Sequence, residues 1–169
     1  MKTYYVKHAI VVEKGIYMRI SSKTSIGTHI MILVALYGDK CKLTGAIISR
    51  STGTNPVITR NLLSDLQNAG LISITRGVGG TQLAKPLDSI SIYDIFEATD
   101  ADEPKDIIAI HTNSHPDCPV GSIIQSVLEE PYGRIGDAIA QAMKKEMLID
   151  LIQDVKEKRP DWLDAVKPD

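Results

Sequence analysis

The stretch Asn55–Gly80, NPVITRNLLSDLQNAGLISITRGVGG, decides the fold of this chain. Asn55 is a helix-capping residue, and Pro56 stands in the first turn, where its missing N–H costs nothing. The apolar residues that follow keep a helical spacing until Gly70, and the predicted buried face consists of Ile58, Leu62, Leu63 and Leu66. Residues 71–74 and 81–84 then read as two short strands around a glycine-rich turn. The stretch therefore predicts a helix followed by a hairpin.

Two helices are predicted before this stretch. Ser22 caps the first, whose apolar spacing stops at Gly38, and Thr44 caps the second, which ends at Gly53. The turn that joins the second helix to the third is tight, as in a helix-turn-helix. The predicted fold is mainly α-helical with a small β-hairpin wing, that is, a winged helix-turn-helix domain with a long C-terminal helix.

The domain boundaries follow from the same patterns. Residues 18–99 form the predicted winged domain, residues 100–121 a connection, and residues 122–169 a dimerisation helix region with a C-terminal tail. The long helix is predicted to open at Gly121-Ser122 and to be kinked or broken near Pro131. Its apolar stripe needs a partner surface, most simply a second copy of the chain. The predicted interface residues are Ile135, Ile139, Met143 and Met147.

Residues 1–17 fit the rest of the pattern poorly. Their apolar residues precede the first convincing helix cap, so we expect an N-terminal extension, either a strand or an arm. A second interpretation makes Met18 the natural start of the protein.

The formal net charge of -2 conceals a strong segregation. Residues 1–86 carry 11 basic and 3 acidic residues (+8), whereas residues 87–169 carry 8 and 18 (-10). Between residues 40 and 86 Asp65 is the only acidic residue. A local positive field of this kind suits a phosphate backbone, and the acidic half should point away from it.

The pattern therefore predicts binding to double-stranded DNA. The first turns of the third helix would enter the major groove, where Asn pairs with adenine, Arg with guanine, and Thr or Pro carbons meet thymine methyl groups. Arg76 at the wing tip would contact a phosphate or a narrow minor groove. The predicted DNA-binding residues are Lys23, Thr44, Arg50, Thr54, Asn55, Pro56, Thr59, Arg60, Arg76, Gly77, Val78 and Gly79.

The cysteine count and hydropathy indicate a reducing compartment. The longest apolar run, residues 30–36, is too short to span a bilayer, and the N-terminus lacks the features of a signal peptide, so we expect a cytoplasmic protein with no membrane contact. Cys41 and Cys118 lie far apart and form no disulfide framework. Each is interpreted either as a packing residue or as a redox-sensing thiol; Cys118 precedes a helix N-terminus, whose dipole lowers a thiol pKa.

Several segments together resemble the Rrf2 family of bacterial transcription regulators. They are residues 70–72 (GLI), 76–80 (RGVGG), 83–86 (LAKP) and 90–95 (ISIYDI), and residues 55–57 (NPV) with 118–121 (CPVG) look most like its YwnA-like subgroup. The resemblance covers residues 18–154. It implies a homodimeric winged-helix repressor whose long helix, residues 134–145, lies in the dimer interface and whose two recognition helices read a palindromic operator.

The chain departs from the cluster-binding members of that family, which carry three spaced cysteines in the connection. Only Cys118 stands there, so we predict no iron–sulfur cluster. His111, His115 and Cys118 have a spacing that could ligate zinc or iron, but histidines in a loop are more often plain surface. We therefore predict no metal and no cofactor.

The leading hypothesis is a dimeric repressor that responds to an oxidant or a small molecule. A regulatory module that docks on a partner enzyme or a small ligand is the alternative. An enzyme is not expected, because His115, Asp117 and Cys118 are too close together in a proline-bounded loop to form an oriented triad.

Overall fold

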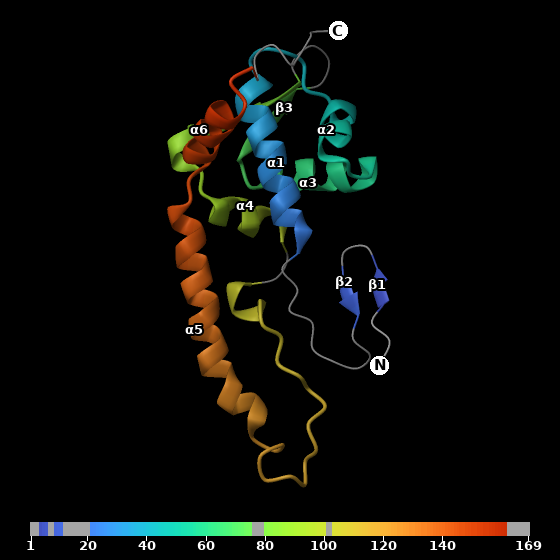
Figure 1. Cartoon of the computed structure of the whole chain (residues 1–169), viewed down its shortest axis with the longest axis vertical. Helices are drawn as coiled ribbons and strands as arrows, with labels where there is room; N and C mark the ends of the chain where they lie inside the picture. The colour runs from blue at the N-terminus through green and yellow to red at the C-terminus, as the bar shows by residue number, and fades with distance from the viewer. Residues whose placement is uncertain (1–3, 7–8, 12–20, 76–79, 101–102, 162–169) are drawn as a thin grey trace. The chain divides into compact units, whose positions relative to one another are not determined.

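The computed structural model describes residues 4–6, 9–11, 21–75, 80–100 and 103–161 (Figure 1). The chain divides into two compact units. The first contains residues 1–20 and 104–137, and the second contains residues 21–103 and 138–169. The second unit holds the predicted winged domain.

Helix α1 (Ser22–Tyr37) runs through the middle of the second unit. Its cap is Ser21, one residue earlier than predicted, whose Oγ accepts a hydrogen bond from the N–H of Lys23. Ile30, Met31 and Val34 are buried on its inner face. They form one core with Leu62 and Leu66 of α3, so α1 supports α3 through this core.

Helices α2 (Gly45–Thr52) and α3 (Pro56–Asn68) confirm the predicted helix-turn-helix. Thr44 caps α2, Asn55 caps α3, and Pro56 stands in the first turn of α3, all as predicted. Gly53 ends α2 at a φ of 64°, in the left-handed region that favours glycine. The connection needs only residues 53–55.

The hairpin consists of β3 (Ile72–Thr75) and β4 (Gly80–Leu83), paired antiparallel with Ile72 opposite Leu83. The N–H of Thr81 donates to the carbonyl of Leu43 at 3.2 Å, and its hydroxyl donates to the same oxygen. The start of β4 is therefore fixed to the segment that leads into α2. A short 3-10 helix, η1 (Leu87–Ser89), follows the hairpin.

Helix α4 (Ile92–Thr99) begins with a capping box between Ser91 and Asp94. Helix α6 (Leu148–Lys158) packs against α1 and η1, and Leu148 and Ile152 join the same core as Ile30. The C-terminal segment was predicted to belong to the dimerisation region, but α6 completes the core of the winged unit.

Met147 lies between α5 and α6. It pairs with Ser91 in an isolated antiparallel bridge, and the N–H of Leu148 donates to the carbonyl of Ile90 at 2.8 Å. The prediction that Met147 continues the apolar stripe of the long helix is therefore wrong. Met147 is a half-buried cap, because the helix has already ended at Lys145.

In the first unit, β1 (Tyr4–Val6) and β2 (Ala9–Val11) form an antiparallel hairpin within the predicted N-terminal extension. A 3-10 helix, η2 (Pro104–Asp106), is followed by turns up to Ile123. Helix α5 (Ile124–Lys145) begins in this unit and contributes residues 138–145 to the second unit. It begins three residues after Gly121 and runs without a break through Pro131, so the predicted break is wrong. None of the helices within the described residues is long and apolar enough to cross a membrane.

Candidate nucleic-acid interface

A chain of hydroxyl groups holds the turn between α2 and α3. Thr54 Oγ1 lies 2.7 Å from Thr52 Oγ1 and 2.7 Å from Thr59 Oγ1. Ser49 Oγ donates to the carbonyl of Thr54 at 2.6 Å, and the N–H of Thr54 donates to the carbonyl of Ser49. Thr52 Oγ1 also donates to the carbonyl of Ile48 at 2.9 Å. The last turn of α2 and the first turn of α3 are therefore joined by side chains as well as by the backbone.

The first turn of α3 faces outward from this turn. Asn55 Oδ1 accepts a hydrogen bond from the N–H of Val57 at 2.8 Å, so its amide nitrogen is directed away from the cap. With about 3.6 residues per turn, five exposed side chains of α3 form one stripe opposite its buried leucines, and Pro56, Ile58 and Gln67 are exposed beside this stripe. The side chains on this stripe are Val57, Arg60, Asn61, Ser64 and Asn68.

Most of the predicted contact residues are accessible. Lys23, Arg50, Asn55, Pro56 and Arg60 are exposed, and Thr44 and Thr54 are half-buried. Lys23 stands at the start of α1, Arg50 on α2, and the other three exposed residues at the start of α3. The predicted wing-tip residues Arg76, Gly77, Val78 and Gly79 lie outside the described residues.

Two predictions about α3 are wrong. Thr59 was predicted to contact DNA, but its side chain is only 1% exposed and its hydroxyl bonds to that of Thr54. Its role is to hold the turn. Ile58 was predicted to belong to the buried face, but it is 45% exposed. The buried face of α3 is instead formed by Thr59 with Leu62, Leu63 and Leu66.

Sequence reasoning also missed Val57, Asn61 and Ser64, which share the exposed stripe with Arg60. The signal for them was available in the helical period. If Thr59, instead of Ile58, is assigned to the buried face with the leucines, the helical period places Val57, Asn61 and Ser64 on the exposed face.

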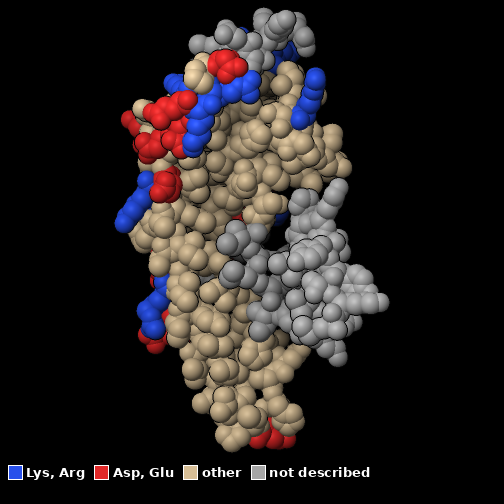
Figure 2. Space-filling view, in the orientation of Figure 1, with Lys and Arg blue, Asp and Glu red and all other residues tan. Residues whose placement is uncertain are grey.

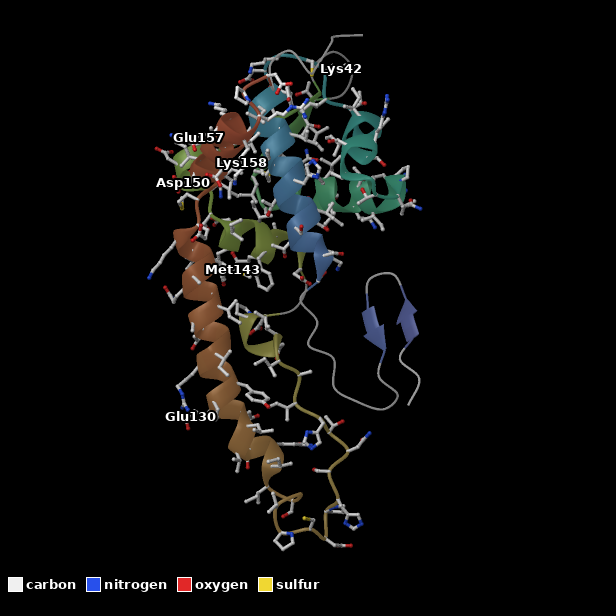
Figure 3. The ribbon with its side chains drawn as sticks, in the orientation of Figure 1. Lys42, Glu130, Met143, Asp150, Glu157 and Lys158 are labelled. Carbon is white, nitrogen blue, oxygen red and sulfur yellow. The ribbon has the colours of Figure 1, made fainter. Side chains whose placement is uncertain are left out.

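The charges of the second unit are arranged by face. The exposed basic side chains Lys40, Lys42, Arg50, Arg60 and Lys85 lie in the part of the chain that forms the turn, α3 and the hairpin. On the face shown in Figure 2, several red acidic side chains gather over α6 beside blue basic ones, and no red side chain is seen over α2 and α3. Figure 3 shows Asp150 and Glu157 of α6 on the opposite side of α1 from α2 and α3. Among the described residues of the turn, α3 and the hairpin, the one acidic side chain is that of Asp65 on α3, which is half-buried, so the exposed charge there is positive.

The two cysteines lie in different surroundings. Cys41 is half-buried, and its N–H donates to the carbonyl of Tyr37 at 3.0 Å. Cys118 is exposed in the turns of the first unit. The backbone N–H groups of Gly121 and then Val120 lie against its sulfur and hold the pKa of the Cys118 thiol below its usual range. Cys118 is thus the more accessible thiol of the two.

A helix-turn-helix whose second helix is exposed along a polar, basic stripe, followed by a hairpin, defines a winged helix-turn-helix DNA-binding protein. Residues 20–154 match the model of the Rrf2 family, described as an iron-dependent transcriptional regulator. The chain belongs to this family. It is a DNA-binding transcription regulator.

Individual relatives agree with this assignment. The chain is 32% identical over 136 residues to YwnA of Bacillus subtilis, named as an HTH-type transcriptional regulator; the match covers 80% of this chain and 96% of YwnA. The structure is similar to that of CymR, the global cysteine regulator of B. subtilis, with a TM-score of 0.59 and 25% identity over 80% of this chain and 96% of CymR. IscR of T. potens shares the fold, with a TM-score of 0.60 and 20% identity over 83% and 90% of the two chains.

The family description raises the question of iron. An iron–sulfur cluster needs several thiolates, and Cys118 is the only cysteine in the connection. Nearby, His115 Nδ1 accepts a hydrogen bond from the N–H of Asp117 at 3.3 Å. The lone pair of Nδ1 is therefore directed to the backbone. Within the described part of the chain, no three His, Cys, Asp or Glu side chains stand close enough to hold a metal ion. The donor set of the connection does not fit a cluster.

Replacing Thr59 by valine tests the hydroxyl chain. The substitution keeps the shape of the side chain but removes the hydrogen bond to Thr54 Oγ1, so we expect the free energy of unfolding to fall by about 1 kcal/mol. Ser64→Ala on the exposed stripe of the same helix is the control, with an expected change within about 0.5 kcal/mol. Urea unfolding followed by circular dichroism measures both. Equal stability of the two variants would contradict a structural role of the Thr59 hydroxyl.

Proposed function

We propose that this regulator is a homodimeric repressor that inserts the first turns of α3 into the major grooves of a palindromic operator. The observation that carries the proposal is the exposed stripe of α3, which is held by the hydroxyl chain and is joined on α3 by one acidic residue, the half-buried Asp65. Phosphate contacts require a positive field, and base contacts require a fixed helix.

Each contact residue has a distinct role in this proposal. Asn55 and Arg60 would read base edges, because an amide pairs with adenine and a guanidinium with guanine. Lys23, Thr44 and Arg50 would contact phosphates and set the position of the domain on the duplex. Arg76 and the glycines of the wing tip stay predicted contacts for the neighbouring groove.

The proposed dimer interface follows the apolar stripe of α5. Ile135, Ile139 and Met143 are spaced by four residues and so share one face of the helix. Ile135 is 43% exposed, and Ile139 and Met143 are half-buried. Covering this face with the same face of a second copy would remove apolar surface from water and create the two-fold symmetry that a palindrome needs.

Cys118 is the proposed sensor of an oxidant. Its thiol is exposed and its pKa is lowered by two backbone N–H groups, so the reactive thiolate is favoured. Peroxide would transfer one oxygen to the sulfur, forming a sulfenic acid and releasing water. The added polar group would disturb the turn in which the N–H of Ser122 donates to the carbonyl of Cys118. A small molecule that binds elsewhere is the alternative signal.

Arg60→Ala tests the base contact. The variant should lose about 1–3 kcal/mol of binding free energy on the cognate operator and should stop discriminating at one base pair of each half-site. Lys158→Ala on α6, an exposed lysine paired with Asp154, is the control and should bind like the parent. Fluorescence anisotropy with single-base operator variants measures both. An unchanged base preference in Arg60→Ala would place direct readout on other residues.

Ile135→Glu tests the dimer. The new carboxylate stays solvated in a monomer but would be buried without a partner in the proposed interface, so we expect the dimer to dissociate at micromolar concentration. Gln141→Glu adds the same charge at an exposed position of α5 and should leave the dimer intact. Light scattering distinguishes the two states. A dimer that survives Ile135→Glu would place the interface on another surface.

Cys118→Ser tests the sensor. Peroxide should release operator DNA from the parent and from Cys41→Ser, while Cys118→Ser should keep its operator. Alkylation of Cys118 in Cys41→Ser should have a pH midpoint below that of the same protein unfolded in urea, because the backbone N–H groups stabilise the thiolate only in the folded chain. Equal peroxide sensitivity of the parent and Cys118→Ser would direct the search for a signal to a bound ligand.

A further inference from the structure

The first turn of α3 exposes two large apolar side chains that the core does not use. Val57 is 50% exposed and Ile58 is 45% exposed. In the described part of the second unit, the other exposed large apolar side chains are Ile47 on α2 and Ile149 on α6. Exposed apolar surface does not stabilise a fold, and β-branched residues are not favoured in helices. Folding therefore gives no reason for this pair of residues.

The positions of both side chains are fixed before any partner binds. The N–H of Val57 is bound by the cap, and the N–H of Thr59 donates to the carbonyl of Asn55 at 3.0 Å. The hydroxyls of Thr54 and Thr59 hold the same turn from the inner side. Branching at Cβ then restricts each side chain to few rotamers in a helix. Val57 and Ile58 are thus a rigid apolar pair.

The surroundings of this pair identify its partner. Asn55 and Arg60 are exposed on the same turns of α3, Arg50 is exposed on α2, and no acidic side chain lies between residues 40 and 64. The partner surface must combine negative charge with small apolar groups within reach of a helix. The major groove of DNA has this combination only where thymine presents its C5-methyl group.

We propose that Val57 and Ile58 contact thymine methyl groups and make the regulator selective for A·T pairs where the first turn of α3 meets the bases. The Asn55 amide, next to them, would bind an adenine of the same step. The proposal rests on the insertion of α3 into the major groove and adds the base composition that this helix selects.

The experiment begins with selection of operators from a random duplex library by the full-length protein. The selected half-sites should contain thymine at one or two fixed positions. Replacing each thymine by deoxyuridine then removes only the C5-methyl group. At the positions read by α3 we expect the affinity of the parent to fall about fourfold for each methyl group, the effect of leaving one methyl-sized group unburied.

Two variants assign the effect to residues. In Val57→Ala and Ile58→Ala the affinity for the thymine operator should fall, and the difference between thymine and deoxyuridine should disappear at the position that each side chain reads. Ile149→Ala is the matched control, because Ile149 is an isoleucine of similar exposure, 43%, on α6. It should keep the full fourfold difference. Thermal melting should give the same midpoint for all three variants, since the substituted side chains are exposed.

The outcomes separate this proposal from the one on which it rests. Sequence-specific binding that does not respond to deoxyuridine would overturn the contact with thymine and leave the placement of α3 in the groove intact. A deoxyuridine effect that persists in both alanine variants would assign the methyl contact to other residues and would also overturn the proposal. Failure of the selection to enrich any sequence would overturn the proposed function itself.

Discussion

The hydroxyl chain from Thr52 through Thr54 to Thr59 is the constraint on which the proposed recognition surface depends. A helix-turn-helix must present its second helix at a fixed angle, yet here the connection contains only three residues, one of them glycine. The backbone of so short a turn has several accessible conformations. Because the Thr54 hydroxyl bonds to one neighbour on each side, at 2.7 Å in both cases, it selects one of them and joins the end of α2 to the buried face of α3. The position of every side chain expected to make a contact from α3 therefore depends on the geometry of this turn.

A second connection lies at the other end of the winged unit. Ser91 caps α4 with its side chain while its backbone pairs with Met147, and the N–H of Ile92 donates to the carbonyl of Glu146 at 2.8 Å. The residues between α5 and α6 are therefore bound directly to the start of α4. Lys144 lies near the end of α5, and its Nζ is 4.4 Å from the centroid of the Tyr93 ring. The C-terminal end of the proposed dimerisation helix is thus held to the core that supports α3.

Local sequence signals predicted the helices and strands well. Features that depend on contacts between residues distant in the sequence were not predicted. Thr44, Gly53 and the pair Asn55-Pro56 act on their own turns, so their positions were readable from the sequence. The predicted environments of Thr59 and Ile58 were the reverse of the observed ones, because isoleucine is more often a core residue than threonine. The hydroxyl group of Thr59 can be buried because it is hydrogen-bonded to the hydroxyl of Thr54, five residues away. Met147 was misplaced because its bridge to Ser91 spans 56 residues. The exposed residues Val57, Asn61 and Ser64 of α3 were missed for the same reason: the phase of the helix is set by its packing.

The charge segregation found in the sequence takes a different form in the fold. It was expected to separate two halves of the chain, with the acidic half directed away from DNA. Residues 87–103 contain six acidic residues and no basic one, and they belong to the same unit as the basic residues around α3. The boundary between positive and negative charge therefore falls inside the winged unit, between the hairpin and α4. A single folded unit with charge of opposite sign on different elements has a strong dipole, and a DNA duplex attracts one end of it and repels the other. Such a field would favour an approach of the duplex to the elements that carry the basic residues, so that the proposed contacts of α3 would need to discriminate only among sequences that already face it.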